Sequence, residues 1–196
     1  MLKNNNLYEI PENIPVPVDD GACDHLTGLH LPSIALQSTS DRMVNLSNLQ
    51  GRVVLYCYPR TGQPNKELPQ GWNEIPGARG CTPQSCSFRD HYRELQMLGA
   101  QVFGLSAQNT PYQQEAVERL YLPFELLSDS ALDFATRLKL PTFDIAGMTL
   151  VKRLTLIVSD GQIEKVFYPV FPPDKNAEEV INWLTTNPPR ATKTNR

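Results

Sequence analysis

The sequence predicts an α/β fold in which a mixed central sheet is flanked by helices. Short apolar, β-rich runs alternate with helix-like segments from Val53–Tyr58 onwards, and this alternation is typical of a parallel sheet core. Near the C-terminus, the runs 154–158 and 163–168 flank an Asp160-Gly161 turn, which is a strong hairpin signal. That hairpin is expected to add antiparallel strands on one side of the parallel core.

Composition points to a globular protein of ordinary type. Of the 196 residues, 40% are hydrophobic and 20% charged, and the net charge of −3 indicates neither a nucleic-acid-binding nor a polybasic membrane surface. No apolar stretch approaches the roughly 18–20 residues of a transmembrane helix, and residues 1–9 lack a signal-peptide core. We therefore expect a cytoplasmic protein, without nucleic-acid or membrane partners. In that reducing compartment, close cysteine pairs are more often catalytic or metal-binding than structural.

The first half of the chain contains an arm, a hairpin, a strand and a long loop. The first 22 residues carry three prolines and no periodicity, and we expect residues 1–28 to form an extended arm. Residues 29–49 alternate apolar and polar around Ser40-Asp41, as a β-hairpin would. The buried strand Val53–Tyr58 is followed by a loop of about twenty residues, Arg60–Arg79, a length that is usually functional in a compact domain.

The second half alternates helices and strands. We first expect a helix from Cys81 through 91–98 to Gly99, and then a strand over 101–106. A helix capped by Thr110, with Pro111 at its first position, precedes a strand over 124–127. A helix opened by 128–130 ends near Leu140, and the C-terminal hairpin is followed by a last helix behind the capping box Asn176-x-x-Glu179. This order is that of a thioredoxin-like fold with an N-terminal β-hairpin extension. The domain is expected to span residues 29–187, before a flexible tail at 188–196.

Cys81 is the candidate reactive residue. It follows the buried strand and the long loop, and it stands at the start of a helix-like segment. The free N–H groups and the dipole at a helix N-terminus favour negative charge, and such positions lower the pKa of a cysteine. The thiolate is the nucleophilic form, so this placement predicts a reactive thiol. Cys86, five residues later, is the obvious partner for a disulfide.

The spacing of this pair predicts a conformational step. Two helical residues five positions apart have Cα atoms roughly 8–9 Å apart, whereas a disulfide needs them within about 7 Å. If both cysteines are helical, a bond between them requires the first turn of the helix to unwind. The pair therefore suits a redox cycle better than a static structural bridge.

Four motifs resemble those of the peroxiredoxins, in their bacterioferritin-comigratory or Q branch. They are Tyr58-Pro59-Arg60, Gly80-Cys81-Thr82-Pro83-Gln84-Ser85-Cys86-Ser87-Phe88-Arg89-Asp90, Leu126-Leu127-Ser128-Asp129 and Lys152-Arg153-Leu154-Thr155-Leu156-Ile157. The resemblance covers roughly residues 30–185. It implies that Cys81 attacks the peroxide and becomes a sulfenic acid, and that Cys86 resolves this acid to an intramolecular disulfide. It further implies that Arg153 holds the thiolate and polarises the peroxide.

The resemblance also implies substrates and partners. Hydrogen peroxide and small organic hydroperoxides would be reduced, and a thioredoxin-type partner would reduce the disulfide. No metal, haem or flavin is implied, and we expect a monomer or a weak homodimer. Two rival functions stay open: a general thiol–disulfide oxidoreductase, against which the absence of a Cys-x-x-Cys pair counts, and a non-catalytic thioredoxin-like binding module.

The residues agree with the role that the resemblance implies for Arg153, because it precedes the most buried-looking strand, where an arginine needs a partner. The alternative is a surface arginine at a strand end. The sequence departs from the family motif before the reactive cysteine, where Glu74 and Ala78 replace a proline and a threonine. The insertion 61–79 displaces the familiar proline to Pro59. Whether Thr61 folds back to supply the missing hydroxyl is left open.

The remaining signals are weaker. Cys57 is expected in the core, and Cys23 with His25 lacks the further ligands of a zinc site. Trp72 either covers the pocket or anchors the inserted loop. Arg89 and Asp90 are expected to pair with each other or with neighbours.

Overall fold

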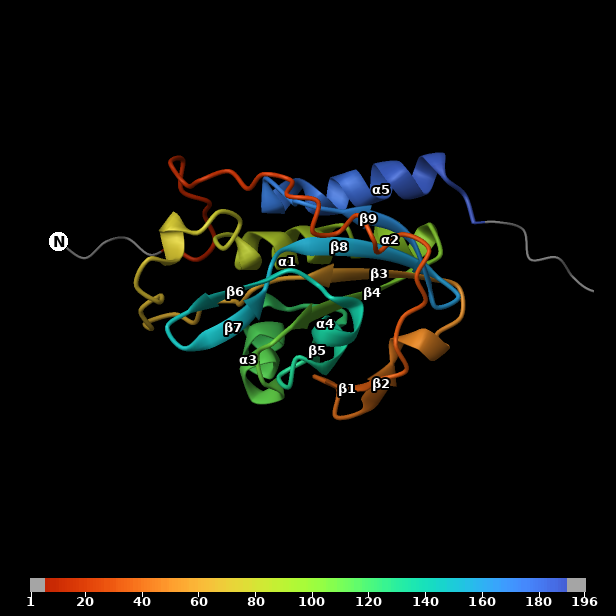
Figure 1. Ribbon diagram of the computed structural model, residues 1–196, viewed down its shortest axis with the longest axis horizontal. Coiled ribbons are helices and arrows are strands. Elements are labelled where there is room, and N and C mark those ends of the chain that lie inside the picture. The colour runs from red at the N-terminus through yellow and green to blue at the C-terminus, as the bar shows by residue number, and fades with distance from the viewer. Residues whose placement is uncertain (1–5, 190–196) are drawn as a thin grey trace, which may run out of the picture.

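The computed structural model describes residues 6–189 (Figure 1). A seven-stranded sheet forms the centre of the fold. The strand order is β2-β1-β5-β4-β3-β8-β9. The bounds are β1 (Ala35–Ser38), β2 (Met43–Asn45), β3 (Arg52–Cys57), β4 (Ala100–Ser106), β5 (Glu125–Ser128), β8 (Leu154–Ser159) and β9 (Gln162–Phe167). Strands β3, β4 and β5 are parallel, while β8 pairs antiparallel with β3 and β9 with β8. The predicted mixed sheet, with its C-terminal hairpin beside a parallel core, is confirmed.

Strand β3 lies at the centre of the molecule, and all six of its residues are buried. Successive side chains of a strand point to opposite faces. Accordingly, Val53 and Leu55 enter one apolar cluster, and Val54 and Tyr56 enter the other. The continuous apolar run in the sequence is thus explained by a strand that is covered on both faces.

Helices cover both faces of the sheet. They are α1 (Cys81–Asp90), α2 (Tyr92–Met97), α3 (Thr110–Leu120), α4 (Asp133–Leu138) and α5 (Asn176–Thr186). Buried residues of α1, α2, α3 and α5 share the cluster of Tyr56, while those of α4 share the cluster of Leu55. No helix within residues 6–189 has both the length and the apolar character needed to cross a membrane.

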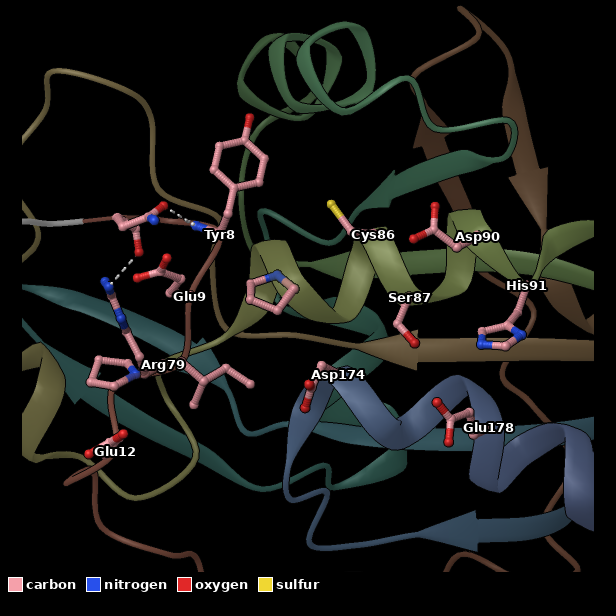
Figure 2. Close-up of a pocket in the computed structure, with 14 residues that line it drawn as sticks. Tyr8, Glu9, Glu12, Arg79, Cys86, Ser87, Asp90, His91, Asp174 and Glu178 are labelled. Carbon is pink, nitrogen blue, oxygen red and sulfur yellow. Dashed lines mark hydrogen bonds between the residues drawn. The ribbon is translucent and has the colours of Figure 1, made fainter.

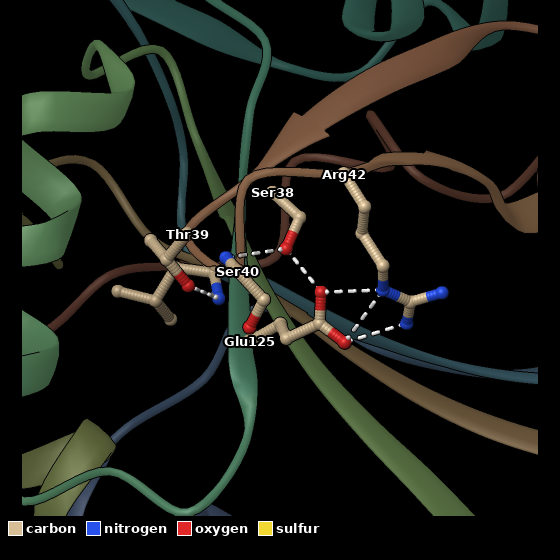
Figure 3. Close-up of polar contacts among 6 residues, drawn as sticks. Ser38, Thr39, Ser40, Arg42 and Glu125 are labelled. Carbon is tan, nitrogen blue, oxygen red and sulfur yellow. Dashed lines mark hydrogen bonds and ion pairs between the residues drawn. The ribbon is translucent and has the colours of Figure 1, made fainter.

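The predicted N-terminal hairpin is confirmed as β1 and β2, and it extends the sheet beyond β5. Figure 3 shows its polar attachment to β5. The Ser38 hydroxyl donates to the Glu125 carboxylate, and Arg42 forms an ion pair with the same group. The Arg42 side chain is 54% exposed, so this ion pair adds only about 0–1 kcal/mol. The backbone ladder and the buried Leu36 and Val44 therefore contribute most of the attachment.

The N-terminal arm has no regular secondary structure between residues 6 and 28. Its later part is tied to the domain, because Leu26 is fully buried. Asp20 also accepts bonds from Lys152 at 3.0 Å and from the Tyr168 hydroxyl at 2.8 Å. Residues 1–5 of the predicted arm and residues 190–196 of the predicted tail lie outside the described residues.

Several predicted boundaries were wrong. The helix expected from Cys81 to Gly99 is broken at His91, whose φ of −97° and ψ of 6° leave the helical region. The cap of α3 is Asn109, whose side chain accepts from the backbone N–H of Tyr112, and Thr110 is the first helical residue. Helix α4 begins only at Asp133, because Ser128 still belongs to β5 and residues 129–132 form a turn that ends at Leu132, whose φ is +57°.

A second, two-stranded sheet was not predicted. Strands β6 (Thr142–Ile145) and β7 (Met148–Val151) form a hairpin around Ala146 and Gly147, both with positive φ. Each strand has only four residues, and a non-glycine residue with positive φ at the turn is uncommon. The pattern therefore carries little signal in the sequence.

Candidate active site

Cys81 is the first residue of α1 and is 4% exposed. Gly80 precedes it with a φ of +100°, which turns the inserted loop into the helix. A Cβ on Gly80 would lie 2.3 Å from Cγ of Pro173 and 3.6 Å from Cγ1 of Ile10. Only glycine combines this backbone conformation with so close an approach. The thiol therefore stands at a helix N-terminus, as the sequence predicted.

Arg153 is in direct contact with this thiol. Its Nη2 donates to Sγ of Cys81 at 3.1 Å, and the arginine is only 3% exposed. Arg153 lies between β7 and β8, so residues 72 positions apart in the sequence meet at this end of the sheet. A buried guanidinium with a thiol partner excludes the alternative of a surface arginine.

The end of the inserted loop encloses the Arg153 guanidinium. Its Nε donates to the backbone carbonyl of Gly77 at 3.2 Å, and its Nη2 lies 3.1 Å from the carbonyls of both Ala78 and Arg79. The Gln84 side-chain oxygen accepts from Nη1. These acceptors hold the arginine in one orientation against Cys81. Sequence reasoning missed the three backbone carbonyls, because every residue type carries a backbone carbonyl.

Gln84 is positioned in turn by Asn176. Its Nε2 donates to Oδ1 of Asn176 at 3.0 Å, and the same oxygen accepts from the Thr155 hydroxyl at 2.6 Å. The predicted capping box was therefore wrong: Lys175 occupies the N-cap position of α5 without a side-chain cap, and Asn176 is fully buried. The amide that was read as a helix cap instead connects α5 and β8 to the site.

Cys86 lies on the same helix and faces a different space. It borders a cavity of about 830 Å³ between the arm, α1 and α5, shown in Figure 2 with Tyr8 and Glu9 of the arm opposite. Burial raises the pKa of the Cys86 thiol, and the positive charge of Arg89 partly opposes this shift. Both cysteines are free thiols within α1. The predicted helical spacing of the pair is thus confirmed.

The inserted loop is anchored by Trp72, which is 3% exposed. The indole packs in a small apolar cluster with Ala78 and Leu150, and its ring centroid lies 6.1 Å from that of Phe143. Of the two roles left open for Trp72, the anchor is the one observed. The unpredicted β6–β7 hairpin supplies the surface against which it packs.

Thr61 does not fold back toward Cys81. Its hydroxyl and its backbone N–H both lie within hydrogen-bond distance of Oε1 of Gln108, at 3.2 and 3.0 Å. Ala78, at the position of the family threonine, is fully buried and has no hydroxyl to offer. The hydroxyl expected in the family motif is therefore not supplied by either residue.

The weaker candidates occupy structural positions. Cys57 lies in the core, where burial raises its pKa, and burial raises the pKa of Cys23 to about 12. His25 Nε2 lies 2.9 Å from the carbonyl oxygen of Leu138. Arg89 and Asp90 form the expected ion pair, at 2.8 Å. Within residues 6–189, no group of three or more His, Cys, Asp or Glu side chains is arranged to hold a metal ion.

Comparison with known proteins places the chain in a family. The Redoxin family model matches residues 26–181. The chain is 31% identical to peroxiredoxin Q of rice (Oryza sativa subsp. japonica, chloroplastic), over 80% of this chain and 65% of the relative. It is 30% identical to peroxiredoxin Bcp of Escherichia coli, over 78% of this chain and 91% of the relative. The chain thus spans slightly less than two thirds of the length of the rice relative.

A solved structure has a similar fold. Peroxidoxin BcpB of Mycobacterium tuberculosis superposes with a TM-score of 0.68 and 25% identity, covering 83% of this chain and 99% of that protein. The fold is thioredoxin-like, and at its site the thiol of Cys81 is in contact with the buried Arg153. The chain belongs to the Redoxin family, within the peroxiredoxins of the Q and Bcp type.

Proposed function

We propose that this chain is a thiol peroxidase whose reactive residue is Cys81. The observation that carries the proposal is the contact of 3.1 Å between the buried Arg153 guanidinium and Sγ of Cys81 at a helix N-terminus. Two positive electrostatic influences, the guanidinium and the helix dipole, then act on one sulfur. The thiolate attacks one peroxide oxygen and the O–O bond breaks, giving a Cys81 sulfenic acid and an alkoxide or hydroxide, which takes up a proton.

Cys86 completes the proposed cycle. Unwinding of the first turns of α1 exposes this thiol to water and so removes the burial that raises its pKa. The Cys86 thiolate attacks the sulfenic sulfur, forming a disulfide and releasing the sulfenic oxygen as water once a proton is supplied. A dithiol of the thioredoxin type then reduces this disulfide and is itself oxidised.

A coupled assay tests the function. The protein is mixed with thioredoxin, thioredoxin reductase and NADPH, and NADPH oxidation is followed after addition of hydrogen peroxide or cumene hydroperoxide. We expect peroxide-dependent NADPH oxidation. Reduction of insulin disulfides without peroxide turnover would instead support a general thiol–disulfide oxidoreductase, and a protein inactive in both assays would be a binding module.

Cys86→Ser is expected to distinguish the roles of the two thiols in the cycle. The first turnover stays fast, because Arg153 and Cys81 are untouched, but thioredoxin recycling fails and Cys81 proceeds to sulfinic acid under excess peroxide. Intact mass measurement after one and after many equivalents of peroxide checks this. A disulfide from Cys81 to Cys23 or Cys57 in the oxidised wild type would assign the resolving role elsewhere.

Arg153→Met is expected to slow the reactions of the Cys81 thiol. The substitution keeps much of the buried apolar stem of the side chain. The substitution removes the only guanidinium that the described residues place in contact with the sulfur. Because the thiolate then loses its nearest positive charge, alkylation of Cys81 by iodoacetamide should require a higher pH. The pH profile of alkylation, read by peptide mass spectrometry, is the measurement. An unchanged profile would show that the guanidinium does not act on the thiolate.

The finer expectations from the sequence belong to this proposal. They are a cytoplasmic location, a monomer or weak homodimer, no nucleic-acid or membrane partner, and no metal, haem or flavin cofactor. The division into an arm at 1–28, a domain at 29–187 and a tail at 188–196 likewise stays a prediction.

A further inference from the structure

Asn176 is a buried amide that is linked to the reactive cysteine by a chain of hydrogen bonds. Asn176 of α5, Gln84 of α1 and Thr155 of β8 are all fully buried. Oδ1 of Asn176 accepts from Nε2 of Gln84 at 3.0 Å and from the Thr155 hydroxyl at 2.6 Å. Oε1 of Gln84 accepts from Nη1 of Arg153, and Nη2 of that arginine donates to Sγ of Cys81 at 3.1 Å. The last helix of the fold is thus connected to the sulfur through two side chains.

The Arg153 guanidinium determines the polarity of this chain, because it carries only donors. Within residues 6–189, Oε1 of Gln84 is the only hydrogen-bond acceptor for Nη1, whereas the three backbone carbonyls of the inserted loop accept from Nε and Nη2. If the Gln84 amide were turned by half a rotation, its NH2 group would face Nη1, and two donors would oppose each other. Because Gln84 is fully buried, both donors would stay unsatisfied, which is costly. The position of the guanidinium therefore depends on the orientation of the Gln84 amide.

The Asn176 amide holds Gln84 in the required orientation. Its oxygen receives the NH2 group of Gln84, so a turned Gln84 would bring two oxygens together at this end as well. The Thr155 hydroxyl donates to the same oxygen and keeps it directed at Gln84. The other end of the Asn176 amide, Nδ2, is buried and has no hydrogen-bond partner in the described part of the chain, which is rare for a polar atom. The side-chain hydrogen bonds of Asn176 are therefore made by its oxygen alone.

We propose that Asn176 is a positioning residue for the reaction of Cys81, because its amide oxygen fixes the Gln84 side chain that orders Arg153 against the sulfur. This inference rests on the proposed function and assigns a role in the reaction to α5. Asn176 carries no charge, so it acts on the thiolate only through the orientation of the guanidinium. Since backbone carbonyls also hold Arg153, loss of the Asn176 amide is expected to weaken the action of the guanidinium on Cys81 and not to abolish it.

Two substitutions and a control test this chain of hydrogen bonds. Asn176→Ala removes the oxygen that fixes Gln84. Thr155→Val largely conserves the shape of the side chain and removes the hydroxyl that donates to Asn176. The matched control is Asn182→Ala, which removes an exposed asparagine from the same helix.

The first readout is the pH profile of Cys81 alkylation by iodoacetamide in the full-length protein, followed by peptide mass spectrometry. The second is the rate of reaction with hydrogen peroxide at pH 6. For Asn176→Ala we expect the alkylation profile to move up by about 0.3–1 pH unit and the peroxide reaction to slow about twofold to tenfold, since one pH unit is tenfold in thiolate fraction. Thr155→Val should move both quantities in the same direction by a smaller amount, and Asn182→Ala should match the wild type.

Gln84→Glu distinguishes positioning from a general loosening of α5. An ionised carboxylate has two oxygens and no donor, so either orientation of the side chain offers Arg153 an acceptor. The orientation then no longer depends on Asn176. Adding Asn176→Ala to Gln84→Glu should therefore leave the alkylation profile of the Gln84→Glu variant unmoved. A purely structural role of Asn176 would instead shift the profile equally in both backgrounds.

Three outcomes would overturn the inference. They are an Asn176→Ala profile equal to that of the wild type, an equal shift from Asn176→Ala with and without Gln84→Glu, and an equal shift in Asn182→Ala. If Asn176→Ala does not fold, Thr155→Val decides in its place, and an unmoved profile there overturns the inference. A wild type that does not consume peroxide would refute the proposed peroxidase, while the alkylation profiles would still report whether Asn176 acts on Cys81.

Discussion

Replacing Cys81 with serine is expected to lower peroxide turnover by about a thousandfold or more, as is usual for loss of a nucleophile. Arg153 donates to the sulfur at 3.1 Å, and a guanidinium in this position favours the negatively charged form of its partner. A serine hydroxyl at the same place stays protonated without an adjacent base. It is also a poor nucleophile toward an O–O bond.

The measurement is the rate of peroxide loss in the thioredoxin-coupled assay, with Cys23→Ala as the matched control. Cys23 is also a buried thiol, but burial raises its pKa to about 12 and it lies in the arm. We expect the control to retain turnover. Substantial turnover in Cys81→Ser would place the nucleophile on another residue and would refute the assignment of the site.

The elements that position Cys81 and Cys86 were predictable because their signals are local. The continuous apolar run of β3, the long loop and the start of α1 follow one another in sequence, and they placed Cys81 and Cys86 on one helix. Arg153 was predicted mainly from the resemblance to the peroxiredoxins, and its place beside a buried strand, where an arginine needs a partner, agreed with that prediction. The carbonyls of Gly77, Ala78 and Arg79 that hold it were not predictable, since acceptors of this kind leave no trace in side-chain identity.

Asn176 illustrates a second limit. The pattern Asn-x-x-Glu is a sound signal for a helix start, and α5 does begin there. What the pattern does not contain is the tertiary contact: Asn176 is fully buried and its amide oxygen accepts from Gln84 and Thr155. A local rule therefore located the helix correctly and misassigned the side chain, because the competing partners lie on distant segments.

The proposed disulfide requires a conformational change in α1. Closing a Cys81–Cys86 bond requires the segment between them to leave the helix. This breaks the hydrogen bond that Arg153 donates to Gln84 and the one that the Tyr56 hydroxyl donates to the Ser85 hydroxyl at 3.1 Å. The backbone hydrogen bonds lost with it are worth about 0.5–1.5 kcal/mol each. Further along α1, the Phe88 ring stacks on Tyr56 with centroids 4.6 Å apart. We expect this buried contact to hold the rest of the helix.

Amide hydrogen exchange should therefore differ between the two redox states. In the disulfide form we expect amides of residues 84–87 to exchange faster than in the dithiol form, by about tenfold to a hundredfold, which corresponds to the loss of about 1.4–2.8 kcal/mol of local protection. Amides of β3 should stay equally protected in both states, because this strand is buried and paired on both edges.

Peptide-level mass spectrometry of the reduced and the peroxide-oxidised protein makes the comparison, and Cys86→Ser carried through the same oxidation is the control. This variant cannot close the proposed disulfide, so its α1 peptides should keep the exchange rates of the reduced protein. Equal protection of residues 84–87 in both forms of the wild type would mean that α1 never unwinds. Since helical Cα atoms five residues apart are too distant for a disulfide, the pairing of Cys81 with Cys86 would then have to be abandoned.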